Sequence, residues 1–153
     1  MSDTVNHVPT YNSRYDNVVD EKRRIQIPAK WREEGETEFM LILWPNGADK
    51  DACLMVLPPP AAGRLKDKVN GLPFGDPQAE ALRRFLGRKS DTVKSDKMGR
   101  ITLPEPMAVA ADIGTKAVLV GMFDRFQIWS PTKYSTDVVA AEDALATEAF
   151  KLI

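Results

Sequence analysis

A nine-residue pattern that occurs twice constrains the fold of this chain more than any other feature. DEKRRIQIP begins at Asp20 and DKMGRITLP begins at Asp96; both read Asp, three variable residues, Arg, Ile, one polar residue, an aliphatic residue and Pro. A repeated unit of roughly 70 residues buries too little surface to be secure alone. The repeat therefore predicts two similar units that pack on each other in one pseudo-twofold α+β body, with two similar hairpins on related surfaces.

Each copy has the pattern of a β-hairpin followed by a short helix and two apolar strands. An alternating segment leads into a four-residue turn, and a second alternating segment ends at the proline. Proline suits the first turn of a helix, so we expect short helices directly after Pro28 and Pro104. The apolar runs that predict the following strands are FMLILW, CLMVLPP, AVLVGMF and FQIWSP.

The segment between the copies predicts a helix. Asp76 is followed by proline at the first helical position, and Gly87 is placed to end the helix. A C-terminal helix is expected to begin at Ser130-Pro131. These features divide the chain into an N-terminal tail (1–13), a first copy (14–60), a helical linker (61–89), a second copy (90–133) and a C-terminal helix and tail (134–153).

The two predicted turns differ at one position. In the second copy Gly99 can adopt a positive φ at no steric cost, as a tight corner requires. Arg23 takes the equivalent position in the first copy, where left-handed backbone costs a non-glycine residue roughly 1–2 kcal/mol. Either the first corner has another shape, or the cation is useful enough for the strain to be tolerated.

Strand alternation places cations and polar groups on one face of each copy and aliphatic groups on the other. The predicted outward residues are Arg24, Gln26, Arg100 and Thr102, and the predicted inward residues are Ile25, Ile27, Ile101 and Leu103. A two-stranded ribbon fits the ~12 Å major groove of B-DNA, where arginine reads guanine and glutamine reads adenine. This pattern favours a β-ribbon that reads DNA.

The site residues expected from this interpretation fall into three groups. Arg24 and Arg100 are expected to read bases directly, and Gln26 to contact a base. The cations Lys22, Arg23 and Lys97 are expected to attract phosphates. The simpler alternative is that Asp20 with Arg24, and Asp96 with Arg100, pair across each turn as exposed ion pairs worth roughly 0–1 kcal/mol. Both can hold, because a paired arginine keeps further donors free.

The distribution of charge supports a polyanionic partner better than the net charge of −1 suggests. Residues 14–32 hold six basic and three acidic side chains, and residues 64–100 hold ten basic and five acidic ones. The compensating acids collect in 33–38 and after Glu105. Two positive zones therefore lie beside two negative ones, although such runs are often no more than solvated faces.

Catalytic, metal and membrane functions have little support in the sequence. Cys53 is the only cysteine and lies in an apolar run typical of a buried strand, and His7 is the only histidine and lies in a polar tail. We therefore expect no enzyme activity, metal or cofactor. No apolar run approaches the ~18 residues of a membrane span, and the first residues lack a signal-peptide layout. The expected location is the cytoplasm, with no membrane partner.

Two other functions stay open. The double-hairpin body could be a non-catalytic protein-interaction module whose cations dock acidic surfaces. A hydrolase that uses Asp20 and Asp96 as paired carboxylates is less well supported, because each aspartate lies beside cations that keep it ionised. A salt titration against duplexes with and without repeats would separate DNA reading from protein docking.

The repeated motif also resembles a known family. Asp20-x-x-x-Arg24 with Pro28-Ala29-Lys30, the second copy Asp96-x-x-Gly99-Arg100, the linker EALRRFLGRKS and the later VLVGMFDRFQIWSP are similar to the MraZ family. The resemblance runs from about Tyr11 to the helix after Pro131. It departs from the family at Arg23, where glycine or asparagine is usual, and in residues 1–10, which extend past the usual start.

This resemblance implies a fold and a function. The fold would be two AbrB-like swapped-hairpin domains that form a β-barrel-like body. The function would be a transcriptional repressor that binds short direct repeats in double-stranded DNA, upstream of a division and cell-wall gene cluster that includes its own gene. The resemblance also implies a closed homo-oligomeric ring, associated with the nucleoid, that multiplies weak contacts by effective concentration. Arg24 and Arg100 match the motif arginines, and Asp20 and Asp96 the motif aspartates.

Overall fold

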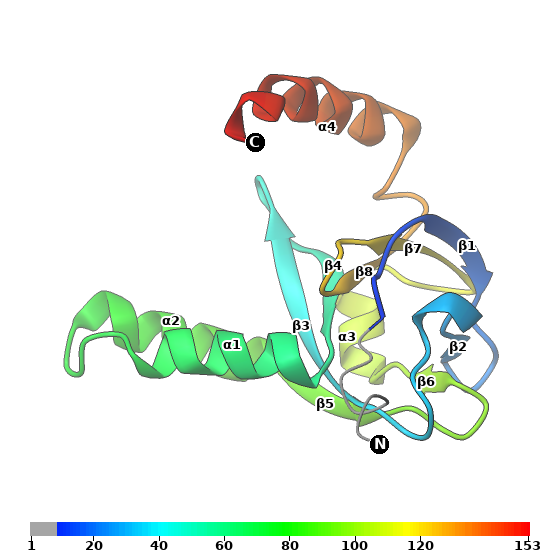
Figure 1. Cartoon of the computed structure of the whole chain (residues 1–153), viewed down its shortest axis with the longest axis horizontal. Helices are drawn as coiled ribbons and strands as arrows, with labels where there is room; N and C mark the ends of the chain where they lie inside the picture. The colour runs from blue at the N-terminus through cyan, green and yellow to red at the C-terminus, as the bar shows by residue number, and fades with distance from the viewer. Residues whose placement is uncertain (1–8) are drawn as a thin grey trace, which may run out of the picture.

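The computed structural model describes residues 9–153, which form an α+β fold with a protruding helical arm (Figure 1). His7 and most of the predicted tail at 1–13 lie outside the described residues. In chain order the elements are β1 (Arg14–Val18), β2 (Arg24–Gln26), η2 (Ala29–Trp31), β3 (Glu38–Asn46), β4 (Asp49–Leu57), α1 (Pro59–Asn70), α2 (Pro77–Lys89), β5 (Ser90–Lys94), β6 (Arg100–Thr102), α3 (Glu105–Ala110), β7 (Lys116–Gly121), β8 (Phe126–Trp129), α4 (Thr136–Ala149) and η3 (Phe150–Leu152).

The two copies exchange strands. The strand before each turn pairs with the other copy: β1 lies antiparallel to β7, and β5 lies antiparallel to β3. The strands after the turns, β2 and β6, pair with each other and form a separate two-stranded ribbon. The larger sheet has six strands in the order β1-β7-β8-β4-β3-β5. Strands of both copies therefore contribute to the one large sheet.

Two expectations about the sheets need correction. The six-stranded sheet has two ends, so the described residues form no closed barrel. The predicted hairpins were also wrong in their pairing, because β1 pairs with β7 and not with β2. Across the first turn the only β-bridge in the described residues joins Val19, just after β1, to Ile25. The turns do form, but burial of the apolar residues of both copies in one core directs the two arms of each turn to different partners.

The core explains why β2 and β6 meet. The inward residues Ile25, Ile27, Ile101 and Leu103 are each no more than 1% exposed and lie in one cluster with Leu41 and Leu119 of the large sheet. Trp31 adds an aromatic group: it is fully buried against Tyr11, Tyr15 and Phe126. The predicted inward face is confirmed, and it fastens the ribbon to the large sheet.

The linker consists of two helices, α1 and α2, which lie side by side and extend away from the sheets (Figure 1). The predicted cap is confirmed, since the Asp76 carboxylate accepts a hydrogen bond from the Ala79 N–H at 2.9 Å. The predicted end at Gly87 was wrong. The helix continues to Lys89 because the next residue, Ser90, already pairs with Ile42 in the sheet.

The C-terminal helix α4 begins later than expected. Ser130 and Pro131 lie in a turn, in which the Ser130 hydroxyl accepts from the Thr132 N–H, and Ser135 is the residue that caps the helix. None of the residues of α4 is buried, and the helix lies apart from the sheets (Figure 1). Between residues 9 and 153, no helix has the length and apolar character needed to cross a membrane.

Candidate nucleic-acid interface

The β2–β6 ribbon brings the two repeated motifs onto one surface. Arg24 lies opposite Thr102, and Gln26 lies opposite Arg100. Because alternate residues share a face, all four polar side chains point away from the core, while Ile25 and Ile101 point into it. Arg24 and Arg100 are thus diagonal neighbours, a relationship that places residues roughly 7–8 Å apart on a sheet.

The first turn holds Arg24 through Asp20. One carboxylate oxygen of Asp20 accepts hydrogen bonds from the backbone N–H groups of Lys22 and Arg24, at 2.9 and 2.8 Å. The other oxygen accepts from Arg24 Nε at 2.8 Å. The same aspartate therefore closes the turn with one oxygen and fixes the direction of the guanidinium with the other.

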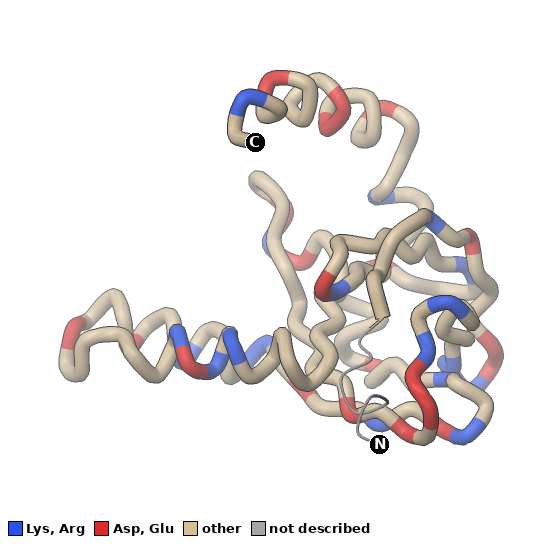
Figure 2. Tube along the Cα trace, in the orientation of Figure 1, with Lys and Arg blue, Asp and Glu red and all other residues tan. Residues whose placement is uncertain are grey.

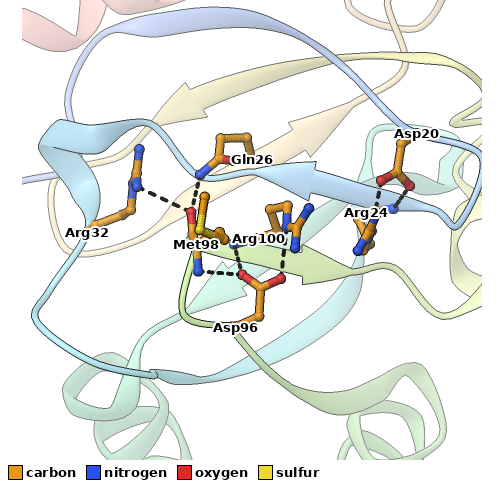
Figure 3. Close-up of polar contacts among 7 residues, drawn as sticks. All are labelled: Asp20, Arg24, Gln26, Arg32, Asp96, Met98 and Arg100. Carbon is orange, nitrogen blue, oxygen red and sulfur yellow. Dashed lines mark hydrogen bonds and ion pairs between the residues drawn. The ribbon is translucent and has the colours of Figure 1, made fainter.

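The second turn repeats this arrangement. Asp96 accepts from the backbone N–H groups of Met98 and Arg100, both at 2.9 Å, and from Arg100 Nε at 2.8 Å. Figure 3 shows the two aspartates at separate turns of the ribbon, each beside its own arginine. The predicted ion pairs are confirmed, and the repeat in sequence becomes a repeat of hydrogen-bond geometry.

These bonds leave much of each guanidinium available. The side chains of Arg24 and Arg100 are 30% and 34% exposed. Only their Nε atoms bond to the aspartates; within residues 9–153 the terminal Nη1 and Nη2 groups of both arginines have no hydrogen-bond partner. Each arginine therefore presents the Nη part of its donor fork to solvent in a fixed orientation, as recognition of guanine or phosphate requires.

The same bonds make the aspartates poor general acids. Hydrogen bonds from the Arg24 backbone, and then from its side chain, hold the pKa of Asp20 below its usual range. The pKa of Asp96 is lowered in the same way by Arg100. A general acid that works near neutral pH needs a raised pKa, so neither carboxylate is suited to that role. Among the described residues, no group of three metal-binding side chains could hold an ion.

Both corners adopt the same left-handed backbone. Gly99 has φ +79° and Arg23 has φ +61°. The Arg23 N–H donates to the Asp20 carbonyl within the turn, at 2.9 Å. Contacts with the second copy also hold Arg23: its carbonyl accepts from the Leu103 N–H at 2.8 Å, its Nε donates to the Leu103 carbonyl at 3.1 Å, and its Nη1 lies 3.6 Å from Glu105. The first corner therefore keeps the shape of the second in spite of its arginine.

Gln26 has a structural contact besides the base contact expected of it. Its amide nitrogen donates to the Met98 carbonyl in the second turn, and Arg32 Nη1 donates to the same carbonyl at 3.2 Å (Figure 3). The oxygen of Gln26 and its second amide hydrogen stay available. The sequence did not point to Arg32 or Met98 as contact residues, because nothing local indicates that the residue after η2 reaches the other copy's turn.

Among the described residues, the ribbon and the linker each carry both paired and unpaired cations. Lys22 and Lys97 are exposed at the two corners and form no ion pair within the described chain. Several linker cations are instead paired: Arg64 with Asp124 at 2.8 Å, and Lys89 with Asp51 at 2.8 Å. Figure 2 shows Lys and Arg along β2 and its turn and along α1 and α2. Lys22 and Lys97 therefore offer unpaired positive charge at the two corners of the ribbon.

Comparisons with known proteins place the chain in a family. A family model of the MraZ protein, described as antitoxin-like, matches residues 87–150. The chain is 33% identical over 131 residues to a protein of Thermomicrobium roseum, covering 84% of this chain and 89% of that one. It is 34% identical over 143 residues to one of Desulfitobacterium hafniense, covering 94% and 96%. Both relatives are named transcriptional regulator MraZ. The chain belongs to the MraZ family.

Proposed function

We propose that this chain is a DNA-binding transcriptional regulator that reads short direct repeats with the β2–β6 ribbon and performs no catalysis. The observation that carries the proposal is the pair of arginines on one exposed face, each aligned by an aspartate with its Nη donors free. The name of the relatives, transcriptional regulator, agrees with this chemistry.

The ribbon has the dimensions and chemistry of a major-groove reader. Two paired strands enter a groove about 12 Å wide, and arginine donates two hydrogen bonds to O6 and N7 of guanine. In this proposal Arg24 and Arg100 read bases, and Gln26 contacts a base with its remaining amide groups. The buried isoleucines on the other face hold the ribbon rigid, so little entropy is lost when the arginines bind.

Phosphate contacts supply the sequence-independent part of the affinity. Lys22 and Lys97 project from the two corners, and Arg23 lies between Lys22 and Arg24. In this proposal these three cations contact the DNA backbone on the two sides of the groove. Such contacts release counterions, so the affinity falls steeply with salt.

Self-association completes the proposal. One ribbon offers few contacts, whereas several copies in a closed ring could engage repeats about 10 bp apart with multiplied affinity. The exposed apolar residues of the C-terminal segment support association through α4 and η3: Leu145 of α4 is 72% exposed and Leu152 of η3 is 79% exposed. The helix α3 offers less, because Met107 and Ala108 pack inward and Val109 is its one exposed large hydrophobic residue.

The remaining parts of the proposal follow from the family. The two halves 14–60 and 90–133, joined by 61–89, would act as a repressor at the promoter of a division and cell-wall gene cluster, its own gene included. The place of action would be the nucleoid in the cytoplasm.

Binding to a duplex with the promoter repeats, compared with a shuffled duplex of the same composition, tests the proposal. Wild-type protein should prefer the repeats. Arg24→Ala should weaken specific binding roughly 5- to 150-fold, the equivalent of about 1–3 kcal/mol for one base contact. Arg84→Ala is the matched control, because Arg84 lies on α2 with Glu80 3.9 Å away. Equal binding of both duplexes by wild type would favour a protein-interaction module instead.

A further inference from the structure

The two corners of the ribbon differ in the residue that adopts the positive φ. In the first corner the residue with positive φ is Arg23, which carries its own guanidinium. In the second corner the equivalent residue is Gly99, which has no side chain. The backbone bonds of the two turns are equivalent, since Arg23 N–H donates to Asp20 and Gly99 N–H donates to Asp96. The corners thus have one shape and differ in local charge.

Arg32 of the first copy occupies the space above Gly99. A Cβ atom at Gly99 would overlap Arg32 Cδ, and it would lie 2.9 Å from Nε and 3.2 Å from Nη1. The absence of a side chain at Gly99 is therefore what allows the Arg32 side chain to lie across the turn. Arg32 comes from just after η2, so a residue of one copy covers the corner of the other.

Arg32 is oriented by a bond to the turn itself. Its Nη1 donates to the Met98 carbonyl at 3.2 Å, and Gln26 donates to the same oxygen (Figure 3). Arg32 is exposed, and within residues 9–153 its Nε and Nη2 have no hydrogen-bond partner. It lines a pocket of about 200 Å³ together with Glu33, Lys97 and Gly99.

We infer that Arg32 is a further DNA-contacting residue: it gives the second corner the phosphate-binding cation that Arg23 gives the first. The inference rests on the proposed function and extends it, since each corner then offers a lysine, a motif arginine and one more guanidinium. Because Arg32 and Gln26 also bind the turn carbonyl, the two copies would engage DNA as one rigid unit.

Salt titration of the full-length protein tests this inference. Arg32→Gln keeps a polar side chain with an N–H donor and removes the charge, whereas Arg32→Lys keeps the charge. Arg32→Gln should flatten the plot of log affinity against log salt by about one unit, on repeat and shuffled duplexes alike. Arg32→Lys should keep the wild-type slope. Arg84→Gln, on the linker, is the control and should also keep it.

A thermal melt of each variant separates binding from support of the fold. All titrations are done well below the lowest melting temperature. A melt that shifts while the salt slope stays at the wild-type value would show a purely structural role and overturn the inference. Loss of the slope in Arg32→Lys, as in Arg32→Gln, would overturn it as well. Arg24→Ala could lose specific binding while Arg32→Gln keeps the wild-type salt slope. That result would support the proposed function and refute this inference.

Discussion

Arg24 and Arg100 lie diagonally across one two-stranded ribbon, each with its Nε bonded at 2.8 Å to an aspartate four residues earlier. The two motifs that are far apart in the sequence thus form one bivalent surface. This arrangement explains why the motif needs aspartate and arginine at that spacing: the carboxylate closes the turn with one oxygen and orients the guanidinium with the other.

The lowered pKa values of Asp20 and Asp96 predict an acid-sensitive fold. A carboxyl group whose pKa is lower in the folded than in the unfolded chain stabilises the fold fully above its unfolded value. That contribution is lost as the pH falls through the folded pKa. The melting temperature should therefore start to decrease once the pH falls below about 4, because the ordinary pKa of an aspartate is near 3.9.

The variant with both Asp20→Asn and Asp96→Asn checks this assignment. It should melt lower than wild type at pH 7, and the gap should narrow as the pH falls toward 3. Asp124 stays in both proteins, and its pKa is also lowered, first by the Arg125 side chain and then by Arg64, so it cannot create a difference between them. A gap that is constant with pH would show that the two carboxylates are not the groups that titrate.

The positive φ of Arg23 leads us to expect that glycine at this position is more stable than alanine. Arg23→Gly removes a left-handed strain of roughly 1–2 kcal/mol. The variant also loses the hydrogen bond to the Leu103 carbonyl, and glycine raises the entropy of the unfolded chain. These two losses offset the removed strain, so its free energy of unfolding should stay within about 1 kcal/mol of wild type. Arg23→Ala keeps the strain and loses the bond, so it should be the less stable variant. Urea unfolding measures both; equal or greater stability of Arg23→Ala would mean that φ is not positive in solution.

We expect the stability of the fold to be highly sensitive to substitution of Trp31. Its ring is fully buried against Tyr11 and Phe126, and its Nε1 donates to the Asn12 carbonyl at 2.9 Å. Trp31→Ala should lower the free energy of unfolding by about 3–5 kcal/mol. Val109→Ala, at a position 72% exposed, should change it by less than about 0.5 kcal/mol. Similar small losses from both would show that Trp31 is not part of the core.

Features set by neighbouring residues could be predicted from the sequence. Alternation placed Ile25 and Ile101 inward because the two-residue period of a strand is local. The Asp76 cap formed because its partner, the Ala79 N–H, is three residues away. The buried thiol of Cys53 was likewise predictable from its apolar neighbours.

Features set by distant partners could not be predicted. The pairing of β2 with β6, and of β1 with β7, depends on which apolar faces share a core, so a turn motif alone suggested hairpins instead. The end of α2 at Lys89 depends on the pairing of Ser90 with Ile42. The contact of Arg32 with the second turn also depends on the exchange of strands between copies.

Disulfide cross-linking to DNA tests most directly whether the ribbon enters the groove. Met98 is 61% exposed at the second corner, so Met98→Cys introduces a thiol there. Burial raises the pKa of the native Cys53 to about 12 and keeps that thiol unreactive. Gln78→Cys, exposed on α2, is the matched control. With promoter duplexes that carry a thiol tether in the major groove, we predict cross-links from position 98 and none from position 78; cross-links from position 78 alone would contradict the account.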